Sequence, residues 1–248
     1  MSFYSKFAAS YRMVFPFREA VYRFLRDYSG QAGEAVLDVG CGPGDYCGRF
    51  AHDGYRATGI DLDAAMISDA VKSYPEARFH CRNMLELKAV GSGFRCIYSV
   101  GNVLAHLPQS DLMAFIETVR DMLDPGGCWI MQVMNWDSLL KLPEYVFPVK
   151  SIPDAPDPLA FHRSYSSISP DSAIFTFSLF RAADMLFTEQ IKLYPVSSGD
   201  YRRFHEDAGF RCLAMFADFR QSALSDEPGT GLVMVFQKNH HESTDTHF

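Results

Sequence analysis

The sequence has no excess of positive charge. Its 248 residues include 23 Lys and Arg against 30 Asp and Glu, which gives a formal net charge of -7. Proteins that bind nucleic acid neutralise its phosphates with clustered Lys and Arg. The charge balance therefore argues against nucleic acid as a substrate.

The sequence also lacks paired cysteines and long apolar runs. Its six cysteines form no Cys-x-x-Cys pair and no histidine cluster has the spacing of zinc ligands, so neither a disulfide framework nor a metal site is expected. A membrane-spanning helix needs about 20 consecutive apolar residues, and no run approaches that length. We therefore expect a cytoplasmic protein that has reduced thiols and contacts no membrane.

The sequence does contain helical and strand periodicities that alternate along the chain, which predicts an α/β fold. Its length suits a single domain, which we assign to residues 1–238. The last two strands are joined without room for a crossover helix and should be antiparallel. Predicted helices span residues 14–28, 45–52, 64–73, 109–123 and 198–208, and predicted strands span residues 35–39, 56–60, 78–81, 95–100, 128–134, 210–219 and 231–237.

Residues 138–197 interrupt this alternation and are interpreted as a β insert on the substrate side. Five prolines between residues 142 and 158 are expected to break any regular element there. Amphipathic strands are then predicted at residues 161–167, 173–180 and 185–193. The polar, His-rich tail at residues 239–248 is expected to be disordered.

A glycine-rich turn follows the first predicted strand. Asp38 lies near the end of this apolar strand, and the turn Gly40-Cys41-Gly42-Pro43-Gly44 leads into a helix. The three glycines let the backbone turn tightly and let a ligand approach the main chain near helix N-terminal amides. The alternative is a tight turn that binds nothing.

The charges beside this turn distinguish between two cofactor classes. A nicotinamide-binding turn has its third glycine one residue later, where this chain has Asp45. Asp38 and Asp45 would repel a pyrophosphate, whereas they would attract the cationic ammonium and sulfonium of S-adenosylmethionine. The pattern therefore favours S-adenosylmethionine over a dinucleotide.

A further acidic residue ends the second predicted strand, and a polar amide and an apolar side chain follow the third. Asp61 ends the second strand at the distance where a carboxylate would accept both hydroxyls of a ribose. Its alternative role, capping the helix that begins near Ala64, is served at least as well by Asp63. Asn83 and Met84 follow the third strand, where they could bind an adenine ring.

These residues, together with the Asp-Pro-Gly-Gly turn at 124–127, resemble the successive motifs of class I methyltransferases. The resemblance implies a Rossmann-like seven-stranded sheet in the order 3-2-1-4-5-7-6 and S-adenosylmethionine as cofactor, with S-adenosylhomocysteine as product. The methionine moiety would lie near Gly40. Many family members have Asp where this chain has Asn83. The implied cofactor site consists of Asp38, Gly40, Cys41, Gly42, Gly44, Asp61, Leu62, Met66, Asn83, Met84, Val100 and Gly101.

The N-terminus resembles the family's Tyr-x-x-x-Ala-x-x-Tyr lid helix. Phe3-Tyr4 and Ala9-Ser10-Tyr11 carry this likeness. It implies that residues 1–30 form lid helices and that Tyr11 touches the methionine end of the cofactor. The alternative is that Tyr11 is an ordinary aromatic anchor.

Two further segments resemble glycine and sarcosine N-methyltransferases. Residues 101–107 match their Gly-Asn-x-x-x-His-Leu segment, and residues 134–137 resemble their Arg-Asn-Tyr-Asp segment, whose arginine holds the substrate carboxylate. This chain has Met134 at that arginine's position. Leaving a carboxylate unpaired in a closed site costs free energy, so glycine is expected to be a poor substrate, unless an arginine elsewhere substitutes.

His106 and Asn102 are the candidate catalytic residues. Methyl transfer from a sulfonium depends mostly on positioning, so no strong base is obligatory. His106 is the side chain best placed to take a proton from an amine or hydroxyl, although packing against the loop is the favoured alternative. Asn102 is a candidate acceptor for a substrate amine, or a turn residue.

The insert contributes candidate substrate contacts. Phe161, Arg163 and Tyr165 have the same strand parity and are expected to face one side. We assign Arg163 and Tyr165, with Met134, to the substrate pocket, while the other aromatic residues of the insert are interpreted as core.

We predict transfer of a methyl group from S-adenosylmethionine to a small-molecule acceptor at nitrogen or oxygen. The alternatives are a non-catalytic protein that binds S-adenosylmethionine or S-adenosylhomocysteine, and a nicotinamide oxidoreductase. The sequence leaves the choice between monomer and homodimer open.

Overall fold

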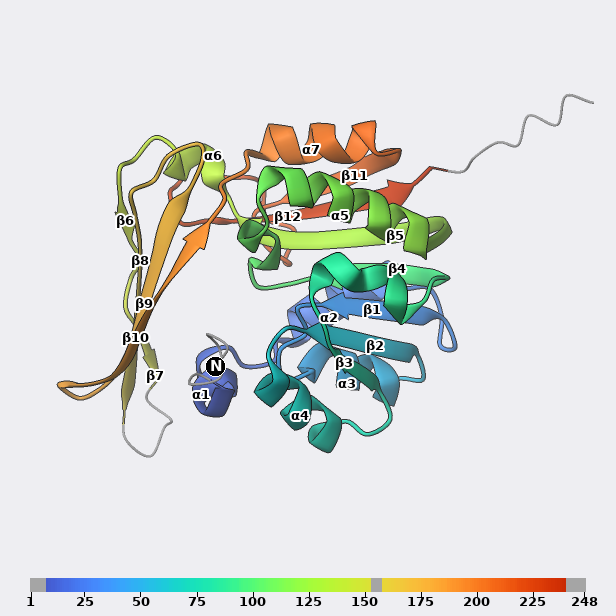
Figure 1. The fold of residues 1–248 in the computed structure, drawn as a ribbon, viewed down its shortest axis with the longest axis horizontal. Coiled ribbons are helices and arrows are strands. Elements are labelled where there is room, and N and C mark those ends of the chain that lie inside the picture. The colour runs from blue at the N-terminus through green and yellow to red at the C-terminus, as the bar shows by residue number, and fades with distance from the viewer. Residues whose placement is uncertain (1–7, 153–157, 240–248) are drawn as a thin grey trace, which may run out of the picture.

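The computed structural model describes residues 8–152 and 158–239 and consists of two β-sheets with helices around the larger one (Figure 1). The larger sheet has the order β11-β12-β5-β4-β1-β2-β3. This confirms the predicted order, and β12 pairs antiparallel with both β5 and β11, as expected. Its strands are β1 (Ala35–Val39), β2 (Arg56–Asp61), β3 (Arg78–Cys81), β4 (Phe94–Ser99), β5 (Leu123–Met134), β11 (Phe210–Phe216) and β12 (Gly231–Lys238).

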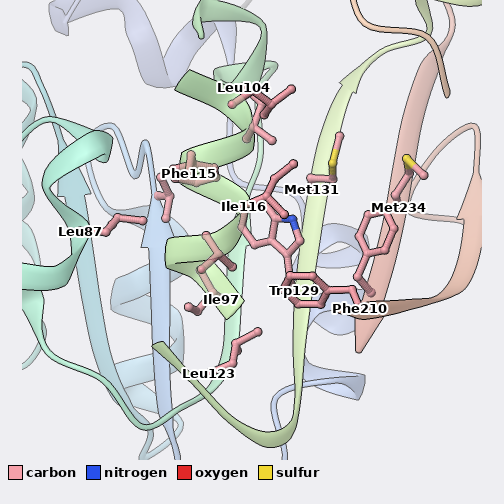
Figure 2. Packing of buried hydrophobic residues seen from close by; sticks show 14 of the residues in the cluster. Leu87, Ile97, Leu104, Phe115, Ile116, Leu123, Trp129, Met131, Phe210 and Met234 are labelled. Carbon is pink, nitrogen blue, oxygen red and sulfur yellow. The ribbon is translucent and has the colours of Figure 1, made fainter. Parts of the chain in front are cut away.

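Helices cover both faces of this sheet, and for that reason all five residues of β1 are buried and four of them are apolar. Leu37 packs on one face with helices α5 (Gln109–Met122) and α7 (Ser198–Asp207) and the 3₁₀ segment η1 (Met84–Val90). Figure 2 shows this face. Val36 packs on the other face with α2 (Glu19–Asp27) and α3 (Asp45–His52). Helix α4 (Ala64–Ser73) contacts β2 and β3.

The smaller sheet is antiparallel and has the order β10-β9-β8-β6, with β7 also paired to β8. It leaves β5 through the short helix α6 (Trp136–Leu139) and returns to α7. Its strands are β6 (Tyr145–Val146), β7 (Lys150–Ile152), β8 (Leu159–Ser166), β9 (Ala173–Arg181) and β10 (Asp184–Leu193).

The prediction that prolines exclude regular structure from residues 142–158 is wrong for β6 and β7. Both strands pair with β8, through Tyr145 opposite Tyr165 and Lys150 opposite Phe161. Proline removes only its own N–H from a ladder and is tolerated at sheet edges. Short strands on either side of Pro148 can therefore form.

The prediction of one helix over residues 14–28 is also wrong. The chain forms α1 (Ala8–Val14) and then α2, with Pro16 in the connection. Proline lacks the N–H that a helix interior needs and disfavours helical geometry in the residue before it. Helix α1 consequently lies apart from α2, between the two sheets (Figure 1).

Several boundaries differ from the predicted ones. Strand β5 begins five residues earlier than expected, at Leu123, and β11 ends at Phe216 rather than at residue 219. Within residues 8–152 and 158–239, no helix combines the length and apolar character needed to cross a membrane. Phe3, Tyr4 and residues 240–248 of the predicted tail lie outside the described residues.

Candidate functional site

A cavity of about 480 Å³ lies between the carboxyl edge of the larger sheet, helix α1 and the smaller sheet. Its volume is within the usual range for small-molecule sites, about 300–1,000 Å³. It brings together most of the residues predicted to surround the methionine moiety and the substrate. The predicted site residues that line it are Tyr11, Asp38, Gly40, Cys41, Val100, Gly101, Asn102, His106, Met134, Arg163 and Tyr165.

The remaining predicted site residues lie outside this cavity lining. Most of them follow β2 and β3, where Leu62 and Asn83 are exposed and Met66 is buried in α4. The structure therefore separates the residues expected to hold ribose and adenine from those expected to hold the reacting end. The residues outside are Gly42, Gly44, Asp61, Leu62, Met66, Asn83 and Met84.

The glycine turn requires glycine for two reasons. Gly40 has a φ of 79°, and a Cβ there would lie 2.6 Å from a methyl carbon of Val103. Gly42 has a φ of 54°, and its Cβ would meet only the Tyr11 ring, at 3.6 Å. Both positions favour glycine by conformation, but only Gly40 is also confined by neighbouring protein atoms. A larger side chain at Gly42, which is buried, would extend toward the Tyr11 ring.

Asp61 holds this turn in place. Its Oδ2 accepts a hydrogen bond from the Gly42 N–H at 2.9 Å, and its Oδ1 accepts one from the Asp63 N–H at 2.9 Å. The expectation that Asp61 has no structural role is therefore wrong. Asp63 caps α4 as expected, accepting from the N–H groups of Ala65 and Met66.

Asp38 is a buried carboxylate near a second one. It is 3% exposed. Burial, followed by the neighbouring charge of Asp61, raises the pKa of Asp38 well above its usual range. A buried carboxylate among other acids is stabilised by an adjacent cation. The site therefore fits a ligand whose bound end is positively charged, as the methionine moiety of S-adenosylmethionine is.

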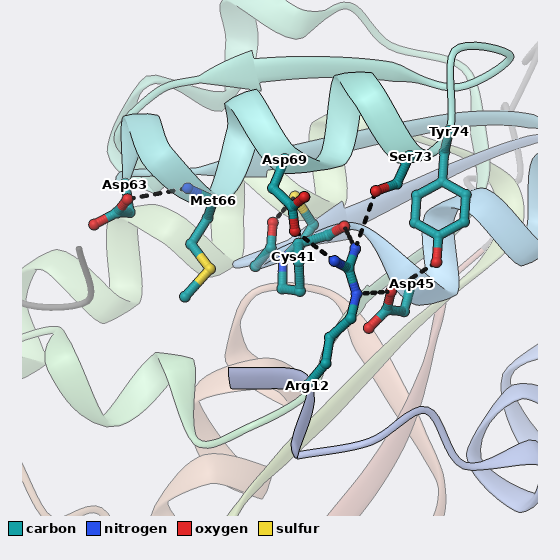
Figure 3. Close-up of polar contacts among 10 residues, drawn as sticks. Arg12, Cys41, Asp45, Asp63, Met66, Asp69, Ser73 and Tyr74 are labelled. Atoms are coloured by element: carbon teal, nitrogen blue, oxygen red, sulfur yellow. Dashed lines mark hydrogen bonds and ion pairs between the residues drawn. The ribbon is translucent and has the colours of Figure 1, made fainter. Parts of the chain in front are cut away.

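Arg12 ties α1 to the glycine turn and to α4 (Figure 3). Its guanidinium donates to Asp45 Oδ1 at 2.8 Å, to Asp69 Oδ2 at 2.5 Å and to the Pro43 carbonyl at 2.9 Å. Asp45 is thus already paired with a cation, contrary to the expectation that its charge is available to the cofactor. Asp38 is therefore the main residue that can attract the positively charged end of the cofactor. Sequence reasoning gave Arg12 no such role, because its partners are far along the chain.

Only part of the predicted lid lies over the cavity. Tyr11 and Phe15 line it, whereas α2 packs on the larger sheet through Val21 and Phe24. Lys150 of β7 donates a hydrogen bond to the carbonyl of Val14, the last residue of α1. Helix α1 is therefore held from both sides, by the larger sheet through Arg12 and by the smaller sheet through Lys150.

Asn102 is built into the scaffold of the site. It has a left-handed φ of 67°, and its Oδ1 accepts a hydrogen bond from the Met134 N–H at 2.9 Å. Gln132 supports the same loop by accepting from the Gly101 N–H at 2.8 Å. The amide oxygen expected to receive a substrate amine therefore already holds β5 to the loop after β4. This geometry favours the alternative role, that of a turn residue.

Asn83 has a similar structural role. It precedes η1, and its Oδ1 accepts a hydrogen bond from the Leu85 N–H at 3.0 Å. This amide oxygen is the atom that the sequence analysis expected to contact adenine. The residue therefore caps η1.

His106 lies in the 3₁₀ segment η2 (Val103–His106) and lines the cavity. Burial lowers the pKa of its imidazole below the ordinary value. The ring is consequently neutral at pH 7 and can accept a proton, although as a weaker base than a free histidine.

The segment similar to Arg-Asn-Tyr-Asp serves mainly as scaffold. Asn135 caps α6 by accepting from the Asp137 N–H, and Asp137 accepts hydrogen bonds from the backbone N–H and the hydroxyl of Ser198, at the start of α7. Neither residue lines the cavity. Of this segment, Met134 alone is part of the lining.

The smaller sheet forms the wall opposite the glycine turn. Phe161, Arg163 and Tyr165 line the cavity from one face of β8, as their parity predicts. Three further residues of the lining, Phe147, Lys150 and Arg18, were not predicted from the sequence. Phe147 and Lys150 lie in the proline-rich segment, where no strands were expected. No local pattern marks these three, since strand pairing and the break at Pro16 place them.

Comparisons with known proteins support the same assignment. A family model described as a methyltransferase domain matches residues 36–127. A protein of Geobacillus sp. (strain WCH70) that is named as a methyltransferase is 26% identical over 217 residues, covering 83% of this chain and 85% of its own. Glycine N-methyltransferase of Rattus norvegicus is 29% identical over 122 residues, 42% of each chain.

A solved structure shares the fold along nearly the whole chain. It is an amino pentose methyltransferase from Micromonospora echinaspora with S-adenosylmethionine bound, and it matches with a TM-score of 0.72 at 19% identity, covering 96% of this chain and 99% of that one. Its likeness extends the match beyond residues 36–127 to the smaller sheet. The sheet order, the acidic cofactor site and these similarities identify the chain as a class I S-adenosylmethionine-dependent methyltransferase.

Proposed function

We propose that the acceptor of the methyl group is a small molecule that is methylated at nitrogen or oxygen. The observation that carries this proposal is the cavity of about 480 Å³, which is bounded by both sheets and by α1. A macromolecular acceptor would need an open surface beside the reacting end. The names of two similar proteins also refer to small acceptors, glycine and an amino pentose.

In this proposal the chain's own residues bind and orient the two reactants. When bound, the cofactor supplies a methyl group already activated on a sulfonium. Asp38 faces the cationic methionine moiety, and the Asp61 carboxylate receives the ribose hydroxyls. Met84 contacts the adenine, and Tyr11 covers the methionine end. Held in line within a closed cavity, the acceptor needs little further activation.

The role of His106 follows from its position. A neutral amine that attacks the methyl group becomes a cation and must lose a proton. His106 lines the substrate side of the cavity, and its lowered pKa keeps it in the proton-accepting form at pH 7. We propose that it takes this proton. A His106→Gln variant should then lower kcat at least about tenfold, with an unchanged dissociation constant for the cofactor. Equal loss of cofactor binding would indicate the packing role instead.

The test has two stages. Isothermal titration with S-adenosylmethionine, S-adenosylhomocysteine and NAD should show binding of the first two only. A methyl-transfer screen over amines, phenols and carboxylates should then give product with a small acceptor. Cofactor binding without any turnover would favour a non-catalytic binding protein. The cytoplasmic location and the absence of a nucleic-acid substrate stay predictions, and size-exclusion chromatography with light scattering would decide the oligomeric state.

A further inference from the structure

The side chain of Arg163 lies in the cavity wall, and within residues 8–152 and 158–239 its buried Nε has no hydrogen-bond partner. Its guanidinium carbon lies 4.7 Å from the centre of the Phe147 ring and 5.7 Å from that of Phe161. Aromatic faces stabilise the charge, but they accept none of its hydrogen bonds in the plane of the guanidinium. A buried N–H donor left unsatisfied is destabilising. The Arg163 Nε therefore provides a donor for an acceptor on a bound ligand.

The acidic residues of the cavity lining and two of its basic residues come from different parts of the fold, and Arg18, just before α2, is a third basic residue of the lining. The acidic lining residues are Asp38 and Asp45, both at the glycine turn, and Asp45 is paired with Arg12. The smaller sheet contributes Arg163 and Lys150. Burial, followed by the charges of Arg163 and Arg18, lowers the pKa of Lys150, as expected for cations that lie near one another. A negative group bound at this wall would offset their mutual repulsion.

Apolar groups surround the positive wall. Phe147, Phe161, Tyr165, Phe175 and Phe177 line the cavity together with Arg163. Met134 lines it from the edge of the larger sheet. The loss of an arginine at residue 134 therefore does not leave the cavity without a cation, because the smaller sheet supplies one from β8.

We infer that the methyl acceptor carries an oxyanion, a carboxylate or phosphate, on an apolar or aromatic body, and that Arg163 binds this oxyanion. The inference rests on the proposed function, in which this wall is the acceptor side of the cavity. The planar guanidinium donates paired hydrogen bonds that match such an anion, and its buried Nε gains the acceptor that it lacks. The aromatic walls take the body of the acceptor and leave its nucleophile toward His106 and the cofactor.

The experiment measures acceptor binding separately from cofactor binding. The probes are phenylalanine, tyrosine and 4-hydroxybenzoate, their matched amides, and O-phosphotyrosine, each titrated in the presence of saturating S-adenosylhomocysteine. At least one oxyanion probe should bind at least about tenfold more tightly than its neutral counterpart, since hydrogen bonds to charged groups are worth about 1.5–3 kcal/mol. The carboxylates and O-phosphotyrosine distinguish the two oxyanion classes.

Variants then assign the preference to Arg163. Arg163→Gln should abolish it, Arg163→Lys should keep part of it, and the affinity for S-adenosylhomocysteine should change less than about twofold. Arg181→Gln, at the exposed end of β9 in the same sheet, is the matched control and should keep the preference. If Arg163→Gln fails to fold by circular dichroism, the comparison of Arg163→Lys with the unsubstituted chain gives the answer.

Three outcomes would overturn the inference alone. These are equal binding of acids and amides, no binding of any probe while S-adenosylhomocysteine binds, and an undiminished preference in a folded Arg163 variant. Weaker S-adenosylhomocysteine binding by Arg163→Gln would also count against it, because it would assign the arginine to the cofactor. Failure of the unsubstituted chain to bind S-adenosylhomocysteine would instead overturn the proposed function and this inference together.

Discussion

The two ends of the cavity differ in charge and in the way the chain builds them. The glycine-turn end is acidic and comes from two neighbouring strands, β1 and β2, with Asp38 and Asp61 near their carboxyl ends. The opposite end is basic and aromatic, and it comes from β7, β8 and β9 of the smaller sheet. The first end suits a cationic cofactor and the second an anionic acceptor. A single cavity can therefore hold both reactants in one orientation.

The largest expected loss of cofactor affinity comes from placing a bulky side chain in the glycine turn at the acidic end of the cavity. Gly42→Val should weaken S-adenosylmethionine binding at least about a hundredfold, because the branched side chain fills the space beside the turn and strains a left-handed residue. Isothermal titration measures the effect, and the fold should survive. Gly33→Val is the matched control, since Gly33 also has a positive φ and its Cβ would meet no atom within 4 Å. Normal binding by Gly42→Val would make the turn purely structural.

The two acids at and just after the end of β2, Asp61 and Asp63, should differ in their effect on cofactor binding. Asp61→Ala should weaken S-adenosylmethionine binding at least about tenfold, since hydrogen bonds to a carboxylate are worth about 1.5–3 kcal/mol each. Asp63→Ala should cost about 1 kcal/mol of unfolding free energy through loss of the α4 cap, with little change in affinity. Titration and thermal unfolding of both variants provide the measurement. An unchanged affinity in a folded Asp61→Ala variant would remove the ribose assignment.

Replacing Asp38 should raise the stability of the cofactor-free protein and weaken cofactor binding. Because the pKa of Asp38 is raised in the folded state, the folded chain binds more protons than the unfolded chain, and its stability should fall as pH rises from the ordinary carboxyl pKa toward the raised one. Asp38→Asn should therefore raise the Tm of the cofactor-free protein at pH 7 by a few degrees, on the order of 1 kcal/mol. It should also weaken S-adenosylmethionine binding several-fold. A lower Tm would indicate that Asp38 is stabilised by a partner within the protein.

The smallest change in affinity is expected at Met134, which lies between the acidic and the basic end of the cavity. Met134 lines the cavity where similar enzymes are expected to hold a carboxylate with arginine. Glycine and sarcosine should be poor substrates of the unsubstituted protein, because they lack the apolar body that the aromatic wall favours. Met134→Arg should raise the affinity for such small carboxylates a few-fold, as measured by competition with the best acceptor of the screen. Rapid methylation of glycine by the unsubstituted protein would contradict this prediction.

The sequence predicted best those structural features that depend on residues close to one another in the chain. The alternation of helices and strands predicted the α/β class, and the resemblance to class I methyltransferases implied the order of the larger sheet, which the structure has. The cap at Asp63 was also predictable, because a capping residue acts within its own turn. Local patterns were less reliable for Asn83 and Asn102, whose amide oxygens are engaged by backbone N–H groups.

The sequence by itself determined the α/β class, the glycine turn between β1 and α3, and the placement of acidic residues at the carboxyl ends of β1 and β2, whereas the sheet order was implied by the resemblance to a known family. Only the tertiary structure decided that Arg12 neutralises Asp45, that Asp61 holds the turn, and that Lys150 and Arg163 meet on one wall. The physical reason is distance along the chain. Periodicity and turn chemistry act over a few residues, whereas the basic wall depends on strand pairing and on the break at Pro16, which places α1 between the sheets.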